Sequence, residues 1–113
     1  MIIVTNEKNS IDGRSAATRA ADVSDPFTRR LVSKYIRRRR SDLDMLGRAL
    51  SDEDFAAIQL TGHRLYGSGA AYGFEQITAI GEGLEKAAAA RQVSVIQALI
   101  DDLREFILDF DIA

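Results

Sequence analysis

From residue 24 to the end of the chain, apolar residues recur at spacings of three and four, the period of one face of an α-helix. The last segment shows this most clearly, through Val93, Ile96, Ile100, Leu103, Ile107 and Phe110. No segment combines the period-two alternation of a β-strand with turn residues at its ends. The periodicity therefore restricts the chain to an all-α fold.

Capping residues mark where the first helix begins and where the second one follows it. Asp25 is a capping candidate, and Pro26 comes next at the first helical position, where its missing N–H is no loss. The stretch "SDED" at 51–54 resembles a capping box, with Ser51 as the cap of the second helix. The first helix is then expected to carry one apolar stripe, made of Phe27, Leu31, Tyr35, Leu43, Leu46 and Leu50.

The remaining helix ends follow from glycine and from the apolar spacing. The second helix extends to about Tyr72, where Gly73 suits a left-handed C-terminal cap. The third helix covers roughly 74–91, and the fourth begins near residue 93. Four helices with short links and one apolar stripe each predict an antiparallel up-down-up-down four-helix bundle.

The domain organisation follows from length and periodicity together. A chain of 113 residues has room for one hydrophobic core. The bundle takes residues 24–113, while residues 1–23 are polar, lack a sustained period and are expected to form a flexible N-terminal arm. One chain can bury all four stripes, so we expect a monomer.

Charge and cysteine content exclude several classes of function. The net charge of −2 provides no overall field for nucleic acid. The run "RRRR" at 37–40 wraps around a helix and is followed by Asp42 and Asp44; a solvated, balanced surface is the main interpretation and docking to an acidic partner the minor one. The chain has no cysteine for a disulfide or a thiolate metal site, and no apolar run suits a signal peptide or membrane span. A soluble cytoplasmic protein without membrane or nucleic-acid partners is expected.

The single histidine opens a stretch with three glycines, "HRLYGSGAAYGF" at 63–74. At 100° per residue, the core face of the second helix comprises Phe55, Ile58, Gly62, Leu65 and Gly69. His63 lies about 120° from the middle of that face, beside Leu60 and Gly67. We therefore expect the histidine to be largely exposed, with open space beside its ring at Gly67.

Several interpretations of a lone exposed histidine remain open on these grounds. The simplest is a surface residue without a function, on a helix whose glycines serve packing. A metal site would need a second histidine or a cysteine, and acid–base catalysis would need an acidic group within one turn to orient the ring. A phosphate-binding glycine loop would follow a strand, whereas this stretch belongs to a helix. A neutral imidazole can also accept an activated phosphoryl group from a partner that carries its own Mg²⁺, which requires only an open approach.

The stretch resembles the signature of the histidine-containing phosphotransfer (HPt) domain family, His-x-x-Lys-Gly-Ser followed five residues later by glycine. Four residues match this signature in register: His63, Gly67, Ser68 and Gly73. Leu84 and Glu85 stand where the family has leucine and an acid or amide, and the resemblance covers about residues 24–112. It implies a phosphorelay intermediate of two-component signalling, which accepts a phosphoryl group from a receiver-domain aspartyl phosphate, passes it on, and has no kinase activity.

The resemblance also implies roles for individual residues. His63 would be the phosphorylated residue, Gly67 would leave space for the partner, and Glu85 would face the ring nitrogen that does not react. The expected partner-binding residues are Leu60, Arg64, Tyr66, Gly67 and Glu85. The partners would be response-regulator receiver domains, with a hybrid histidine kinase as a further candidate. This chain would bind no metal or cofactor, because the Mg²⁺ belongs to the receiver domain.

Tyr66 departs from the family pattern, which most often has lysine at this position. Lysine would place a positive charge beside the phosphoryl oxygens, whereas tyrosine offers a hydroxyl group and no charge. Arg64 is adjacent to His63 in sequence and could compensate, although it projects about 100° away on the helix. The departure keeps an alternative open, in which the bundle is an adaptor that binds partner proteins without being phosphorylated.

Overall fold

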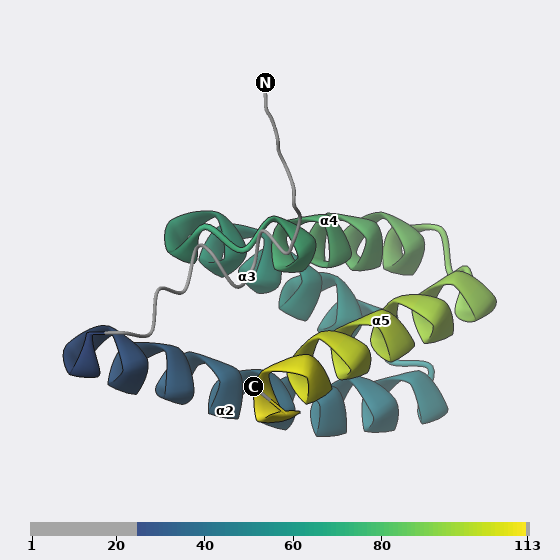
Figure 1. Cartoon of the computed structure of the whole chain (residues 1–113). Coiled ribbons are helices and arrows are strands. Elements are labelled where there is room, and N and C mark those ends of the chain that lie inside the picture. The colour runs from purple at the N-terminus through teal and green to yellow at the C-terminus, as the bar shows by residue number, and fades with distance from the viewer. Residues whose placement is uncertain (1–24, 113) are drawn as a thin grey trace.

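The computed structural model describes residues 25–112, with side chains through residue 110. Within these residues the chain forms four α-helices and no strand: α2 (Pro26–Ser51), α3 (Phe55–Tyr72), α4 (Glu75–Ala89) and α5 (Val93–Ile112) (Figure 1). The all-α prediction is confirmed. None of the described helices combines the length and apolar composition that crossing a membrane requires. The predicted arm, residues 1–23, lies outside the described residues.

The helices enclose a single apolar core. Each helix contacts the next one along the chain, and α2 also contacts α5, so the four close into a ring. The largest fully buried side chains come from all four helices and from the turn before α4: Leu46, Ile58, Leu65, Phe74, Ile77, Leu84, Ile96, Ile100 and Leu103. The described residues therefore form a four-helix bundle around one core.

Two of the predicted helix ends are confirmed. The Asp25 carboxylate caps α2, since it accepts hydrogen bonds from the Thr28 hydroxyl at 2.8 Å and the Thr28 backbone N–H at 2.9 Å. These two hydrogen bonds lower the pKa of the Asp25 carboxyl. At the C-terminal end of α3, Gly73 adopts the left-handed conformation with φ at 78°, which glycine accepts without steric cost. Local sequence chemistry determines both ends.

The predicted cap of α3 is wrong by three residues. Ser51 is the last residue of α2 and does not cap the following helix. Asp54 takes that role, and its carboxylate accepts a 3.1 Å hydrogen bond from the backbone N–H of Ala57. Aspartate and serine are both good N-caps, and Asp54 takes this role because it directly precedes Phe55, where α3 begins.

The predicted stripe of α2 is wrong in its first two turns. Phe27 and Leu31 are 60% and 40% exposed, and the buried residues of this half are Val32, Tyr35 and Ile36. α2 has 26 residues, whereas the other helices have at most 20. Its N-terminal end extends past the other three helices at the left of Figure 1. Helical periodicity identifies a possible apolar face, but a face is buried only where another element reaches it.

Glycines allow α3 and α4 to pack backbone against backbone. A Cβ atom at Gly62 would lie 2.7 Å from the backbone nitrogen of Glu85, and one at Gly69 would lie 2.6 Å from that of Thr78. A side chain at Gly81 would meet the backbone of α3 in the same way. Real Cβ atoms do not come this close to backbone atoms, so these positions require glycine. Because the two backbones are so close, side chains of α4 can reach the outer face of α3.

Candidate functional site

His63 lies on the outer face of α3, and its side chain is 68% exposed. Leu60, one turn earlier, is 51% exposed, and Arg64 and Gly67 are exposed as well. Apart from the backbone of α3 itself, a Cβ atom at Gly67 would meet none of the described residues within 4 Å. The structure thus places the histidine where the helical wheel predicts, with open space beside its ring.

Glu85 reaches the histidine from α4. Its Oε2 atom lies 3.3 Å from Nδ1 of His63, and its side chain is 36% exposed. The backbone of Glu85 packs against Gly62, the residue that precedes the histidine, so the close helix contact brings the two side chains together. Within the described residues, no further cysteine or acidic residue joins His63 and Glu85 to make a group of three that could hold a metal ion.

The rest of the outer face of α3 is shallow around the histidine. Ala56, Ala70 and Ala71 are exposed and small, in addition to the glycine already described. Tyr66 is 44% exposed and its hydroxyl forms no hydrogen bond among the described residues, so the side chain adds surface without adding charge. A second protein can approach the imidazole ring over this face without displacing a large side chain.

Ser68 belongs to the histidine-containing motif, but it faces α2. Its hydroxyl lies 3.1 Å from the Tyr35 hydroxyl and accepts a 3.1 Å hydrogen bond from Nη1 of Arg39. Arg39 also donates to Asp42 at 2.8 Å, and its guanidinium lies 4.4 Å from the centre of the Tyr35 ring. These contacts join the histidine-bearing helix to α2.

The sequence does not reveal this network. Arg39 belongs to the run "RRRR", and its side chain is only 12% exposed, so the interpretation of that run as a solvated surface is wrong for this residue. Tyr35 and Ser68 lie 33 positions apart, and no spacing rule pairs them. The sequence does hint at one contact of the network, because Arg39 and Asp42 are three residues apart on a helix and can form an ion pair.

Arg64 is placed on the α2 side of the histidine. Burial raises the pKa of the Asp42 carboxyl, and the positive charges of Arg39, Arg64 and Arg38 act against that rise. Arg64 also lies one helical turn before Ser68, which contacts α2, so this part of the α3 surface faces toward α2. The predicted site residues thus divide into two groups, with Glu85 against the imidazole ring and Arg64 toward α2.

The fold and the exposed histidine agree with a family of known role. The family model of the Hpt domain matches residues 30–110, from the second turn of α2 to near the end of α5. The chain belongs to the Hpt domain family. Hpt domains are phosphocarriers that take part in histidine phosphotransfer in two-component phosphorelays, without catalytic activity of their own. Comparison with curated proteins and with solved structures finds no match.

Proposed function

We propose that this protein is a phosphorelay intermediate that accepts a phosphoryl group on His63 from the aspartyl phosphate of a receiver domain and passes it to another. The observation that carries the proposal is the exposed imidazole ring, with Nδ1 facing Glu85 at 3.3 Å and with open space at Gly67. Among the described residues, Nε2 of this ring has no hydrogen-bond partner. It is therefore the nitrogen available to a donor.

The transfer chemistry follows from this geometry. A proton on Nδ1 that faces the carboxylate leaves a lone pair on Nε2. Nε2 forms the new bond to phosphorus, the bond from phosphorus to the aspartyl oxygen breaks, and the aspartate leaves as a carboxylate with the electron pair. The phosphohistidine ring then carries a positive charge, which Glu85 stabilises. We expect Mg²⁺ on the receiver domain to offset charge on the phosphoryl oxygens, and no cofactor on this chain.

The partner-binding residues support the same proposal. Leu60 and Tyr66 provide exposed apolar surface on the face that carries the histidine, and Gly67 leaves that face open. An exposed apolar patch with a polar rim is typical of a surface that binds another protein. The partners are receiver domains, with a hybrid histidine kinase as a further candidate.

The proposed molecule is a cytoplasmic monomer with an antiparallel up-down-up-down order of helices. Connections of at most three residues join successive helices, and successive helices contact each other, which supports reversal of direction at each turn. One core serves all four helices within a single chain. The chain has no cysteine, which suits a reducing compartment.

The experiment that tests the function uses two phosphoryl donors. Phosphoramidate can phosphorylate an exposed imidazole without a protein partner, and a panel of phosphorylated receiver domains supplies the natural class of donor. We expect one acid-labile, base-stable label per chain, located on His63 and transferable to an unphosphorylated receiver domain. Label from phosphoramidate without transfer to or from any receiver domain would favour the alternative, a helical adaptor that binds partners without phosphorylation. Tyr66 is the observation that favours this alternative, because it brings no charge to the site.

Tyr66→Lys is expected to raise the rate of phosphoryl acceptance by at most about tenfold. The lysine would bring a positive charge near the phosphoryl oxygens, but position 66 is 44% exposed and water screens the interaction. Stopped-flow or quench-flow transfer from a receiver domain measures the effect, and Tyr66→Gln serves as an uncharged control. A lysine variant slower than wild type would contradict the expectation and would show that the tyrosine contacts the partner.

A further inference from the structure

Two exposed arginines, Arg38 and Arg64, flank the contact between α2 and α3. Arg38 is next to Arg39 on α2, and Arg64 lies one helical turn before Ser68, the residue to which Arg39 donates a hydrogen bond. Both charges act on the carboxylate of Asp42, whose ion pair, at 2.8 Å, is with Arg39. Neither Arg38 nor Arg64 forms an ion pair with any described side chain. This α2–α3 seam, defined by Arg38, Arg39, Asp42 and Arg64, therefore holds three positive charges against one negative charge.

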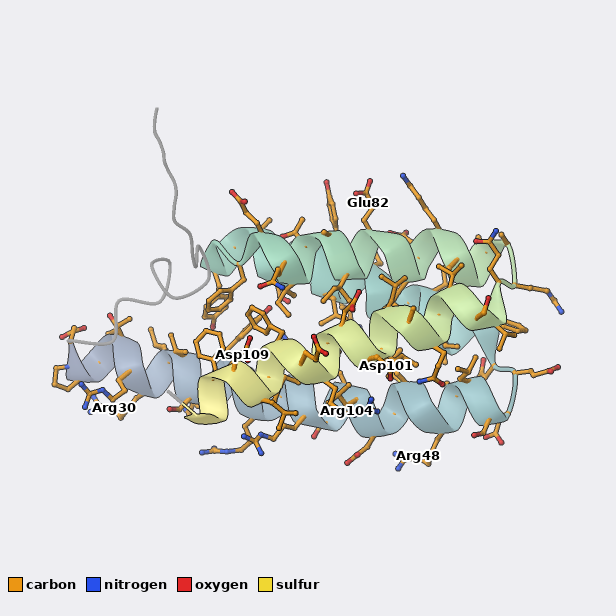
Figure 2. The ribbon with its side chains drawn as sticks, turned by 45° about the vertical axis from the view of Figure 1, so that its right-hand side comes forward. Arg30, Arg48, Glu82, Asp101, Arg104 and Asp109 are labelled. Atoms are coloured by element: carbon orange, nitrogen blue, oxygen red, sulfur yellow. The ribbon has the colours of Figure 1, made fainter. Side chains whose placement is uncertain are left out.

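The two helices that flank α3 carry opposite net charges. α2 carries eight lysine and arginine residues and two aspartates, whereas α4 carries three glutamates and one lysine. Figure 2 shows Arg30 and Arg48 on α2 at one side of the molecule and Glu82 on α4 at the opposite side. α3 packs against both of these helices. Its outer face, with the histidine, is thus flanked by a cationic helix and an anionic one.

We propose that the α2–α3 seam is a docking contact for an acidic edge of the receiver domain that exchanges phosphate with His63. The inference rests on the proposed function and adds the orientation of the partner. The acidic edge of the partner covers α2, and its opposite edge covers α4.

The less exposed residues of the seam hold α2 and α3 together. Arg39 is 12% exposed and is fixed by Asp42, Ser68 and the Tyr35 ring. Asp42 lies one helical turn after Arg38 on α2. The positive charges of Arg38 on α2 and Arg64 on α3 both act on its carboxylate. The helix contact beneath the two exposed arginines is therefore held by hydrogen bonds.

Exposed charges of this kind act mainly on association. A charged patch raises the association rate of an oppositely charged protein by about 10- to 1,000-fold at low salt. The effect falls as salt shortens the Debye length, which is about 10 Å at 0.1 M. The seam should therefore change how fast the partner binds and leave the reactivity of the imidazole ring unchanged.

The test compares Arg38→Glu with Arg37→Glu. Arg37 is the preceding residue, is exposed, and projects about 100° from Arg38 on the helix. Both substitutions change the net charge equally, so they separate the local contact from the overall field. The second-order rate of transfer from the receiver domain that reacts fastest with wild type is measured at about 20 mM and about 500 mM salt. We expect Arg38→Glu to lower the low-salt rate by about tenfold or more, Arg37→Glu by less than about threefold, and the difference to vanish at high salt.

Two further measurements make each outcome decisive. Melting temperature and phosphoramidate labelling should match wild type in both variants, because neither residue touches the imidazole ring. Equal slowing by the two variants, or slowing that persists at high salt, would overturn the seam as a docking contact. If Arg38→Glu unfolds the bundle, Arg64→Glu tests the same contact from α3. Failure of wild type to exchange phosphate with any receiver domain would instead count against the proposed function itself.

Discussion

His63→Gln is expected to abolish phosphoryl acceptance from both phosphoramidate and receiver domains while the bundle stays folded. The side chain is 68% exposed and contacts Glu85, to which a glutamine amide can also donate a hydrogen bond. The free energy of unfolding should therefore change by no more than about 0.5 kcal/mol. Label incorporation and thermal unfolding followed by circular dichroism measure the two parts of the expectation.

The outcome separates a functional histidine from a structural one. Loss of cooperative unfolding in His63→Gln would show that the ring supports the fold, and the argument for the site would fail. Label that persists in a folded His63→Gln variant would place the phosphoryl group elsewhere. The chain has no other histidine, so such a label would also have a different stability toward acid and base.

Gly67→Gln is expected to slow transfer from a receiver domain by about 100-fold or more, equivalent to about 2.7 kcal/mol in activation free energy. A glutamine one helical turn beyond the histidine reaches over the ring and blocks the approach of the aspartyl phosphate. Gly67→Ala, with one methyl group, should slow transfer only moderately. Both substitutions should leave stability unchanged or raise it by up to about 1 kcal/mol, because a Cβ atom here meets no described residue outside the backbone of α3 within 4 Å.

Gly69→Gln is the matched control for the same helix. A Cβ atom at Gly69 would lie 2.6 Å from the Thr78 nitrogen and 3.0 Å from the Phe74 carbonyl oxygen, so any side chain pushes α3 from α4. We expect the free energy of unfolding, measured by urea denaturation, to fall by about 3 kcal/mol or more. A Gly67→Gln variant that unfolds, beside a Gly69→Gln variant that stays folded but transfers slowly, would mean that the roles of the two glycines are reversed.

The helices and the exposed histidine could be predicted because both depend on local chemistry. Apolar spacing, the cap at Asp25 and the left-handed residue at Gly73 act within one or two turns of chain. The wheel of α3 places His63 and Gly67 outward and Gly69 inward, and the burial of these residues agrees. The cap of α3 was predicted at the wrong residue because Ser51 and Asp54 are both good caps, and local preference does not decide between them.

The surroundings of the histidine depend on contacts between helices, which no spacing within one helix specifies. Glu85 reaches the imidazole ring because Gly62 and Gly81 let the α3 and α4 backbones meet. Arg39 is partly buried because α2 lies against α3 at Ser68, and Phe27 is exposed because α2 extends past its neighbours. The sequence by itself determined the helices, the family signature and the outward direction of the histidine, since these follow from the 3.6-residue period and the side-chain types. Only the tertiary structure decided which charges gather around that histidine, because residues distant in sequence become neighbours only when the helices pack.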